Sequence, residues 1–390
     1  MPESRGGVEG IRRANLARLL ELLHHDGEAT RAELTRRTGL NRSTVGALVA
    51  ELERLGLALE SPGVAEAVGR PSPRVRVADR VVAIAVNPEV DAVTVGAVGL
   101  GARVHARIRS EVRGELRPDD AALTVARAVA ELRAGPLRDA RIVGLGAAVP
   151  GLVREDGFVR WAPHLGWNDV PFATLLERAT GIRAVAANDA TLGAVVERRF
   201  GAARGVDDLV YLNGGASGIG GGVVAGGRPL TGWAGYAGEF GHVRAAGLDD
   251  PRDRLSERGM LEDEVRRSRL LEILGLHSAD ETELAEALAA STDPAVGVEL
   301  GRQRRVLGAS LGAICTALNP RVVVLGGFLA AVHASGPDDV VARLADAAIG
   351  PVAEGVEVVP AALGADRLLV GAAELAFAAL LADPAGVLAG

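Results

Sequence analysis

The sequence predicts two parts of different fold class, a small N-terminal module of the winged helix-turn-helix type and a larger α/β body of two lobes. Two observations lead to this prediction. Residues 30–56 carry the signals of two short helices joined by a tight turn. From Val81 onward, short apolar segments typical of strands alternate with amphipathic segments typical of helices, as they do in α/β proteins. We therefore expect a module at residues 1–80 and a body at residues 81–390.

The two short helices of residues 30–56 are marked by their ends. Thr30 and Glu33 have the spacing of a capping box, which begins a helix, and Gly39 is suited to end that helix. Asn41 then caps a second helix. One face of the second helix carries its apolar residues, Val45, Leu48, Val49, Leu52 and Leu55. A short helix that supports a second one in this way is the layout of helix-turn-helix proteins.

The opposite face of the second helix begins with small or hydrogen-bonding side chains. Such side chains at the start of a helix enter the major groove of DNA and meet base edges. The residues that we expect to contact double-stranded DNA in this way are Arg42, Ser43, Thr44 and Gly46. The alternative is a helical hairpin on the surface of a helical domain, because two capped amphipathic helices also occur there.

The flanking segments favour the DNA-binding interpretation. Asn15–Leu23 predicts the third helix that such a module needs for its core, and Leu57–Glu60 and Arg74–Val77 alternate like two strands. The loop between these strands carries Arg70 between a glycine and a proline. A rigid loop that presents Arg70 suits a wing whose tip reaches into a minor groove of the operator.

Charge is distributed unevenly along the chain. Residues 1–80 hold slightly more arginines than acidic residues, whereas the rest of the chain holds fewer, and the net charge is −7. The arginines from Arg70 to Arg80 gather near the predicted wing against only Asp79, so we expect a locally basic field there. The acidic body argues against nucleic acid lying across it.

Composition excludes several classes of protein. With one cysteine, Cys315, the chain has no internal disulfide and no multi-cysteine zinc site. The absence of lysine excludes a phosphate-binding loop built around one. No apolar run reaches the length of a membrane span, and no signal peptide is evident. We expect a cytoplasmic protein that does not associate with membranes.

The segments of the body fall into two sets of strands and helices. In the first set we expect a helix at Ala121–Leu132 and strands at Val81–Val86, Ala92–Val98, Arg103–Arg109, Ile142–Val149 and Val185–Ala187. In the second set we expect strands at Leu209–Leu212, Ile219–Val224, Val322–Leu325 and Val356–Val359, and helices at about Leu261–Leu274, Gly297–Leu318 and Leu368–Leu381. Two such sets predict two lobes with a cleft between them.

A glycine-rich run followed by ionisable residues is the strongest chemical signal in the body. Six glycines fall within residues 214–222, where backbone N–H groups can converge on a phosphate. Glu239 and His242 follow among further glycines, a spacing that suits a site for sugar hydroxyl groups. Two plainer interpretations stay open, a tight hairpin for the glycines and a surface pair for Glu239 and His242.

Further motifs, spread over nearly the whole chain, accompany the predicted winged helix. They are Pro150-Gly151-Leu152-Val153, Pro163-His164-Leu165-Gly166-Trp167, Asn188-Asp189-Ala190, the glycine-rich run with its end Ala237–His242, Val324-Leu325-Gly326-Gly327, and residues 363–376. Together they resemble the ROK family (repressor, open reading frame, kinase) in its transcription-factor branch. The resemblance implies a pair of actin-like, sugar-kinase-like lobes with a sugar in the cleft. Lobe 1 would comprise about 81–190 and a C-terminal helix at about 368–382, and lobe 2 about 191–367.

The resemblance also implies a set of sugar ligands. Asn188 and Asp189 match the Asn-Asp pair that holds the sugar, and in family kinases the aspartate is the general base for the attacking hydroxyl. Glu239 and His242 match the family's Glu-x-Gly-His ligands. Glu262 matches a third sugar carboxyl.

Other positions depart from the family kinases. His164 stands where many of the kinases have an asparagine, so we expect sugar contact there with altered selectivity. The kinases open the first lobe with Asp-x-Gly-x-Thr, which cradles ATP phosphates and serves Mg²⁺. In the corresponding residues 83–89 no aspartate follows the strand, Pro88 replaces a glycine, and Glu89 would repel a triphosphate. Phosphoryl transfer depends on positioning and charge neutralisation, so we expect no enzymatic activity and no cofactor.

The zinc site of the family is also altered. The family holds zinc with a histidine and three cysteines, whereas the corresponding residues 253–260 contain no cysteine. We therefore expect no bound metal. Leu255 and Met260 are expected to pack as apolar residues in place of the ligands, which leaves His242 free for sugar.

The leading hypothesis is a sugar-responsive transcriptional regulator, most simply a repressor, whose body is not an enzyme. A homodimer or homotetramer is expected, because a two-fold operator requires a two-fold protein. One alternative is an active ROK kinase for a hexose or amino sugar, which Asp189 favours and residues 83–89 oppose. The other is a regulator whose body is only a scaffold, which the presence of all the sugar-ligand residues opposes.

Overall fold

The computed structural model describes residues 3–62, 72–112, 114–215, 218–248 and 254–389. The chain divides into two compact units. The first unit comprises Met1–Val149, Asp156–Ala187 and Leu369–Gly390, and the second comprises Pro150–Glu155 and Asn188–Leu368. Among the described residues, no helix has the length and apolar character needed to cross a bilayer.

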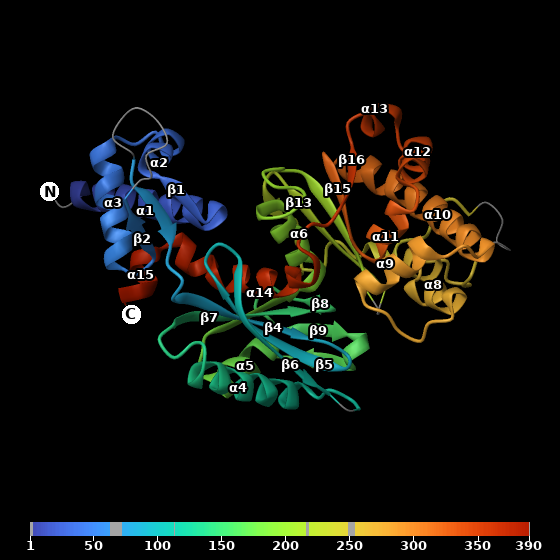
Figure 1. The fold of residues 1–390 in the computed structure, drawn as a ribbon, viewed down its shortest axis with the longest axis horizontal. Coiled ribbons are helices and arrows are strands. Elements are labelled where there is room, and N and C mark those ends of the chain that lie inside the picture. The colour runs from blue at the N-terminus through green and yellow to red at the C-terminus, as the bar shows by residue number, and fades with distance from the viewer. Residues whose placement is uncertain (1–2, 63–71, 113, 216–217, 249–253, 390) are drawn as a thin grey trace. The chain divides into compact units, whose positions relative to one another are not determined.

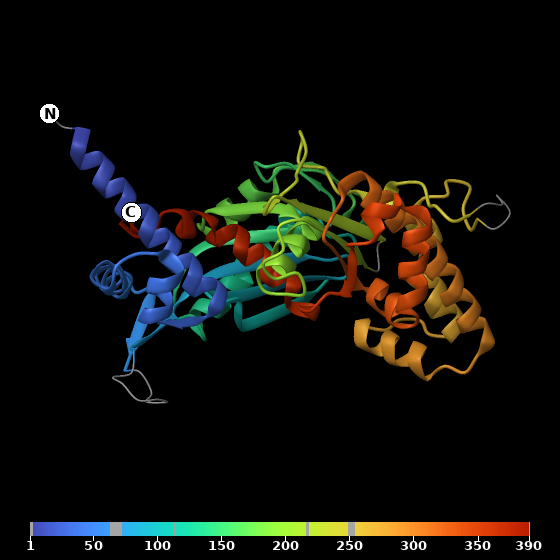
Figure 2. The same ribbon diagram turned by 90° about the horizontal axis from the view of Figure 1, so that it is seen from above.

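The first unit begins with the predicted winged helix-turn-helix module (Figure 1). Its helices are α1 (Glu3–Asp26), α2 (Arg31–Thr38) and α3 (Arg42–Arg54), and its strands are β1 (Glu28–Thr30), β2 (Ala58–Ser61) and β3 (Arg74–Val77). The strands form an antiparallel sheet in the order β1-β3-β2, of which the sequence pattern predicts β2 and β3 but not β1. The N-terminal half of α1 extends past the rest of the module (Figure 2).

The ends of α2 and α3 follow the sequence signals. The Glu33 N–H donates to the Thr30 hydroxyl (3.2 Å) and the Thr30 N–H donates to the Glu33 carboxylate (2.7 Å), which completes the capping box. Gly39 ends α2 in the left-handed conformation, with φ 71°. The Asn41 side chain accepts a hydrogen bond from the Thr44 N–H (2.8 Å) at the start of α3. The helix-turn-helix prediction is confirmed, including its caps.

The rest of the first unit is built around a five-stranded sheet. Its strands are β4 (Val81–Pro88), β5 (Ala92–Gly99), β6 (Arg103–Glu111), β7 (Arg141–Val149) and β11 (Ala184–Asn188), in the order β11-β7-β4-β5-β6. The helices α4 (Pro118–Ala134) and α5 (Phe172–Thr180) lie on one face of the sheet, and α14 (Arg367–Ala382) lies on the other (Figure 1). The unit also contains β9 (Val159–Ala162), the turn η1 (Pro163–Leu165), β10 (Trp167–Val170) and α15 (Pro384–Ala389).

Glycines allow α14 to lie directly on this sheet. A Cβ atom at Gly146 of β7 would overlap the carbonyl oxygen of Ala372, and one at Gly96 of β5 would lie 3.0 Å from Leu369 Cδ1. The missing side chains leave room for the helix backbone, so the close approach requires glycine. Strands β4 and β5 are buried along their whole lengths, as expected of strands that are covered on both faces.

The second unit contains its own five-stranded sheet. Its strands are β12 (Leu209–Gly214), β13 (Ile219–Ala225), β14 (Arg228–Pro229), β15 (Val322–Gly327) and β16 (Glu357–Pro360), in the order β14-β13-β12-β15-β16. Its longer helices are α6 (Asp189–Arg199), α8 (Arg267–Leu274), α9 (Glu281–Ala290), α10 (Pro294–Leu318), α11 (Phe328–Ala334) and α12 (Pro337–Ala347). The shorter elements are β8 (Leu152–Val153), η2 (Phe240–His242), α7 (Leu261–Glu264), α13 (Gly350–Ala353) and η4 (Gly364–Asp366).

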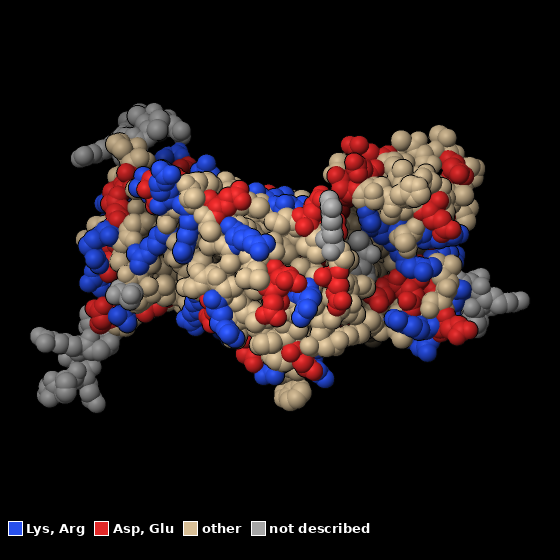
Figure 3. Space-filling view, turned by 90° about the horizontal axis from the view of Figure 1, so that it is seen from below, with Lys and Arg blue, Asp and Glu red and all other residues tan. Residues whose placement is uncertain are grey.

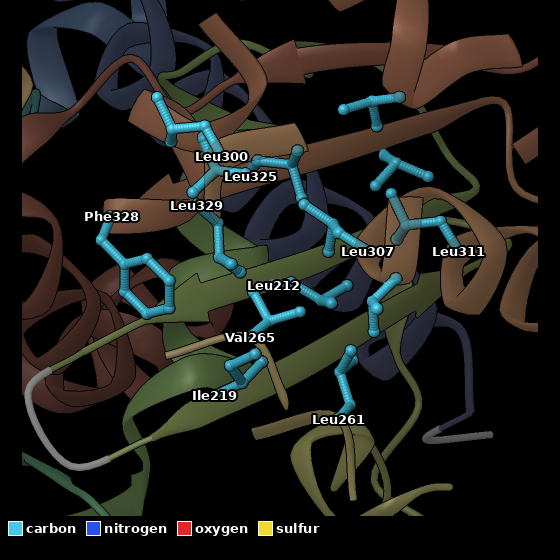
Figure 4. Close-up of a cluster of buried hydrophobic side chains, with 14 of the residues drawn as sticks. Leu212, Ile219, Leu261, Val265, Leu300, Leu307, Leu311, Leu325, Phe328 and Leu329 are labelled. Carbon is cyan, nitrogen blue, oxygen red and sulfur yellow. The ribbon is translucent and has the colours of Figure 1, made fainter. Parts of the chain in front are cut away.

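Alternate residues of β12 and β15 belong to different cores. Leu212 and Leu325 lie in a large apolar cluster with residues of α7 to α12 (Figure 4). Tyr211 and Val324 lie in a smaller cluster that includes Ala194 of α6. Successive side chains of a strand point to opposite faces of a sheet, so α6 covers one face and helices α7 to α12 cover the other. This layered arrangement fits the predicted α/β body.

The structure differs from the prediction of one helix at about Leu261–Leu274. Two helices are present, α7 and α8, and Val265 between them has an extended backbone (φ −105°, ψ 97°). The guanidinium of Arg302 in α10 donates a hydrogen bond to the Glu264 carbonyl oxygen. A helix can end where a side chain from elsewhere satisfies its carbonyl groups, and the sequence of the segment itself does not record that contact.

The sequence prediction lacks several helices of the described chain: α5, α6, α9, α11, α12, α13 and α15. Among these, α9 and α12 carry clear signals at their starts. Asp280 and Glu283 form a capping box at the start of α9, and Pro337 begins α12, followed by acidic residues in its first turn. The residues at the ends of α9 and α12 therefore predict both helices.

Candidate functional site

Asn188 and Asp189 lie where strand β11 ends and helix α6 begins. The Asn188 side-chain oxygen accepts a hydrogen bond from the Thr191 N–H (2.8 Å), and its amide nitrogen donates to the Gly151 carbonyl oxygen (3.1 Å). Both ends of this amide are therefore engaged within the second unit, where they tie α6 to the segment Pro150–Glu155. Asn188 thereby fixes the position of Asp189, the first residue of the helix.

The Asp189 carboxyl has an unusual acidity. Burial raises its pKa to about 6, opposed by a hydrogen bond from the Ala190 N–H (2.8 Å) and by the positive charge of Arg367. The negative charge of Glu239 adds to the rise. A carboxyl that titrates near neutral pH can accept a hydrogen bond or a proton from a ligand hydroxyl.

Glu239, His242 and Glu262 lie together in the second unit. Glu239 precedes the turn η2, which ends at His242, and His242 Nε2 lies 3.7 Å from Glu262 Oε1. Burial raises the pKa of Glu239, opposed by His242 and reinforced by Glu262. In the described part of the chain, no group of three or more such side chains has the arrangement of a metal site. Two carboxyls and an imidazole that converge in this way can hydrogen-bond several hydroxyl groups of one ligand.

Glycines make room for the Glu262 carboxylate. A Cβ atom at Gly218 (φ 140°) would overlap this carboxylate, and one at Gly241 would lie 3.0 Å from Glu262 Oε2. Gly218 also accepts a hydrogen bond from the Gly215 N–H (2.9 Å). Part of the predicted glycine-rich turn, residues 216–217, lies outside the described residues. Gly218, which follows these two residues, makes room for the Glu262 carboxylate.

The buried carboxylate of Glu264 orders the segment before Glu262. It accepts hydrogen bonds from the Leu255 N–H (2.9 and 3.0 Å) and the Ser256 N–H (3.3 Å), and it pairs with Arg302 (3.2 Å). The expectation that Leu255 packs as an apolar residue is wrong, because its side chain is 39 % exposed. Hydrogen bonds from the backbone to Glu264, rather than apolar packing, hold this segment in place.

His164 belongs to the first unit and is exposed in the turn η1. Gly166 ends this turn in the left-handed conformation, with φ 68°. The buried Trp167 follows, and its indole N–H donates to the Leu116 carbonyl oxygen (2.6 Å). His164 is therefore held on an anchored turn, in a different unit from the other five residues expected to bind sugar.

Residues 83–89, which depart from the kinase motif, form most of β4 and the start of the turn after it. The Glu89 N–H donates to the Ala92 carbonyl oxygen (2.7 Å), and the Thr94 hydroxyl donates to the Glu89 carboxylate (3.1 Å). The Arg109 side chain lies 3.8 Å from the same carboxylate. The turn is closed by hydrogen bonds among its own residues, and these contacts engage its carboxylate within the first unit.

The start of α3 carries the residues expected to contact DNA. Arg42 and Ser43 are exposed and Thr44 is half-buried. The Ser43 hydroxyl donates to the Asn41 side-chain oxygen (2.7 Å), so it also supports the helix cap. Arg70, expected at the tip of the wing, lies outside the described residues.

Arg31, the first residue of α2, makes contacts that the sequence pattern does not predict. Its guanidinium donates to the Glu60 carboxylate of β2 (2.6 Å), and a Cβ atom at Gly46 of α3 would lie 3.3 Å from Arg31 Nη1. Gly46 therefore makes room for an ion pair that links α2, α3 and the first wing strand. A glycine inside an amphipathic helix is a sequence signal of such close approach.

Two of the arginines near the wing are paired with carboxylates. Arg74 pairs with Glu28 (2.6 Å), and Arg76 pairs with Asp79 (2.7 Å). On the face drawn in Figure 3, arginine and acidic side chains lie among one another. The field near Arg74 is therefore less basic than the sequence indicates, because Glu28 of β1 comes close to this arginine.

Comparisons with known proteins match two parts of the chain. A model of the ROK family matches residues 102–379, and a model of the MarR family matches residues 10–65. The xylose repressor of Bacillus subtilis strain 168 is 24 % identical over 373 residues, which cover 93 % of this chain and 94 % of the repressor. A glucokinase of Halalkalibacterium halodurans is 29 % identical over 248 residues, which cover 59 % of this chain and 74 % of the glucokinase.

Solved structures share the fold. A ROK family transcriptional regulator, a homologue of the E. coli MLC protein, superposes with a TM-score of 0.77 at 21 % identity, over 97 % of this chain and 100 % of the regulator. A ROK glucokinase from Streptomyces griseus, solved with glucose and AMPPNP, superposes with a TM-score of 0.60 at 24 % identity, over 75 % of this chain and 98 % of the kinase. At these identities the likeness establishes the fold alone.

Proposed function

Because the chain belongs to the ROK family, we propose that it is a DNA-binding transcriptional repressor that responds to a sugar. The observation that carries the proposal is the presence of a MarR-type winged helix and a ROK body in one chain. The xylose repressor aligns with 93 % of the chain, whereas the glucokinase aligns with 59 % of it. The name of the xylose repressor joins repression with a sugar, and we transfer that pairing to this chain as a hypothesis.

In this proposal the second unit holds a neutral sugar, with D-xylose as the first candidate. The hydrogen-bonding groups are Asp189, Glu239, His242 and Glu262, while Asn188 fixes the position of Asp189. Burial raises the pKa values of Asp189 and Glu239. A carboxyl that burial separates from water gains from a hydroxyl donor, which supports a sugar ligand. His164 joins the set through the family resemblance.

The module would bind the operator through the start of α3. Arg42, Ser43 and Thr44 meet the major groove in this proposal, whereas Gly46, also expected at the groove, faces Arg31 within the module. Arg70 contacts the minor groove from the wing. The exposed side chains of Arg42 and Ser43 support this orientation. A homodimer is proposed as well, because a single module covers one half-site of a two-fold operator.

We further propose that the body does not phosphorylate its sugar. The turn after β4 supports this, because its Glu89 carboxylate would repel a triphosphate and residues 83–89 contain no aspartate to serve Mg²⁺. The second candidate function, a ROK sugar kinase, is favoured by one observation. The Asp189 carboxyl, with its pKa near 6, suits a general base for a sugar hydroxyl.

The decisive experiment measures DNA binding and sugar binding in the same preparation. A duplex that the protein selects from a random-sequence library is titrated in gel-shift assays with D-xylose, D-glucose or MgATP, and thermal shifts are recorded with the same compounds. We expect a sugar to raise Tm and weaken DNA binding, and MgATP to do neither. Formation of sugar phosphate from MgATP would support the kinase. Operator binding without any sugar effect would support a scaffold body.

A further inference from the structure

A buried histidine–glutamate pair joins the DNA-binding module to the C-terminal helix. His24 lies in the last turn of α1, and Glu374 lies in the middle of α14. His24 Nε2 is 2.6 Å from Glu374 Oε1, and the two side chains are 0 % and 3 % exposed. Both residues belong to the first unit. Neither side chain is part of the sites described above.

A second hydrogen bond defines the tautomer of His24. The Gly101 N–H donates to His24 Nδ1 (3.0 Å). A backbone N–H only donates, so Nδ1 carries a lone pair and the ring proton is on Nε2, from which it is donated to Glu374. The imidazole ring therefore bonds to two other segments at once, the turn between β5 and β6 and the helix α14.

The surroundings of the pair are closely packed. The ring of Phe377 meets the His24 ring edge-on, with 5.7 Å between ring centroids. Gly101 has a left-handed backbone (φ 77°), and a Cβ atom there would lie 3.5 Å from the Val77 side chain at the end of β3. A hydrogen bond in such a water-poor site is strong and sensitive to direction.

Helix α14 begins in the second unit and continues in the first. Its first residue, Arg367, is 7 % exposed and donates to the Glu281 carboxylate of α9 (2.6 and 3.2 Å). Glu374 follows about two helical turns later, so it lies on nearly the same side of α14. The helix is thus anchored to the second unit by Arg367 and to the DNA-binding module by Glu374.

We propose that His24 and Glu374 are positioning residues for DNA binding, which hold the winged-helix module on α14 so that α3 moves with that helix as one body. The consequence for regulation rests on the proposed function. A sugar that changes the second unit acts on α14 through Arg367, and the His24–Glu374 pair transmits the change to α3. Loss of this contact should leave the protein folded but make its DNA binding insensitive to sugar.

Stability alone does not require this pair. Replacing a buried polar pair with apolar residues of similar volume is often neutral for stability. The pair instead defines the orientation of α1 against α14. The two hydrogen bonds of the His24 ring permit one orientation, whereas apolar contacts permit several. An exposed ion pair joins the same parts of the chain, Arg13 with Asp383 at 3.7 Å, and its solvent exposure makes it a weak restraint.

Distances between spin labels test the orientation directly. Cysteines replace Ala50 of α3 and Ala130 of α4, which are both exposed, while the native Cys315 is buried and escapes labelling. The chain without introduced cysteines is the labelling control. With the pair intact we expect a narrow distribution of label–label distances, because module and sheet form one body.

Variants of the pair then separate orientation from packing. Glu374→Leu should broaden the distance distribution, whereas Glu374→Gln should keep it narrow, since its carbonyl oxygen still accepts from His24 Nε2. Arg13→Ala, at the exposed ion pair, should also keep it narrow. The double variant His24→Leu, Glu374→Leu fills the site with apolar atoms. It replaces Glu374→Leu in the distance measurement if the single variant does not fold. A distribution as narrow as that of the wild type in either folded leucine variant would overturn the proposal.

The response to sugar tests the regulatory consequence. In the wild type, D-xylose or D-glucose should change the affinity for the selected duplex by about 5- to 150-fold, the usual size of allosteric coupling. In Glu374→Leu the calorimetric Kd for the sugar should be unchanged, while the duplex affinity no longer responds. Glu374→Gln should restore the response. A full response in Glu374→Leu overturns the proposal. No response in the wild type overturns the proposed function instead, and the label distances still decide the role of the pair.

Discussion

Carboxylates in two regions of the molecule have opposite surroundings. In the DNA-binding module, a hydrogen bond from Arg76 lowers the pKa of Asp79. In the second unit, burial raises the pKa of Glu239 and raises that of Asp189 to about 6. Donors from the chain therefore stabilise the charged form in the module, whereas burial penalises the charged form in the second unit.

This difference separates residues that maintain the fold from residues available to a ligand. A carboxylate that already has its donors gains little from a new partner, whereas one penalised by burial gains from each hydroxyl donor that a ligand brings. Burial by itself does not assign the role. Glu264 is fully buried in the second unit, yet it has the Leu255 N–H and the Arg302 guanidinium as donors. Glu264 therefore maintains the fold and is not available to a ligand.

The largest effect in this comparison should come from removing the cation beside Glu264. Arg302→Leu leaves a carboxylate that is 0 % exposed without its partner, and we expect the free energy of unfolding to fall by about 3–5 kcal/mol. Urea denaturation followed by circular dichroism measures the loss. Arg74→Leu is the matched control, because the exposed pair with Glu28 is worth about 1 kcal/mol or less. Equal losses at the two sites would contradict the comparison.

The next largest effect concerns Asp189, where a substitution should raise the free energy of unfolding rather than lower it. The folded pKa, about 6, lies above the ordinary value of 3.8, so the folded state holds the proton more tightly. Stability is therefore lost as pH rises from about 4 to about 6, and the loss is complete above about pH 6. Asp189→Asn lacks this cost and should be more stable by up to about 3 kcal/mol near neutral pH, with no gain near pH 4.

A series of urea denaturations between about pH 4 and about pH 7 measures this prediction. The control is Glu357→Gln, which removes an exposed carboxylate of the same unit and should show no such pH dependence. A gain for Asp189→Asn that is constant over the series would show that the change acts through packing rather than through ionisation.

The module could be predicted from sequence because its signals are local. The caps of α2 and α3 join residues three positions apart, Thr30 with Glu33 and Asn41 with Thr44. The break between α7 and α8 could not be predicted, because the guanidinium that takes the Glu264 carbonyl lies 38 residues further along the chain. The His24–Glu374 contact joins residues 350 apart, and no local pattern marks either partner.

The candidate sugar site could be predicted in part. The motifs indicate Asp189, Glu239, His242 and Glu262 as candidate ligands, because the family resemblance relates each of these positions to a sugar-binding position of the family. They do not show which hydrogen-bonding groups are already engaged within the protein. Asn188 uses both ends of its amide inside the second unit, and that fact depends on the path of a segment 37 residues earlier.

Removing the half-buried Glu239 carboxyl of the site should weaken sugar binding without affecting the module. Glu239→Ala loses a hydrogen bond to an ionisable group, so we expect D-xylose affinity to fall by about 1.5–3 kcal/mol, measured by calorimetry. Gel shifts should then show the variant still bound to its duplex at a sugar concentration that releases the wild type. Glu257→Ala removes an exposed carboxylate nearby in sequence and is the control. Unchanged sugar affinity in Glu239→Ala would remove this residue from the proposed site.

The smallest effect is expected on the DNA-binding surface, where the residues concerned are exposed arginines rather than carboxyl groups inside the second unit. Arg42 is exposed at the start of α3, and Arg42→Ala should weaken binding to the selected duplex by about 1–3 kcal/mol and relax selectivity at one base pair. Arg74→Ala should weaken binding less, and equally for all sequences, because its guanidinium is already paired with Glu28 (2.6 Å). Competition gel shifts with single-base variants of the duplex distinguish the two outcomes. If Arg42→Ala loses affinity uniformly, then Arg42 contacts phosphate rather than a base edge, and base recognition must lie with other residues of α3.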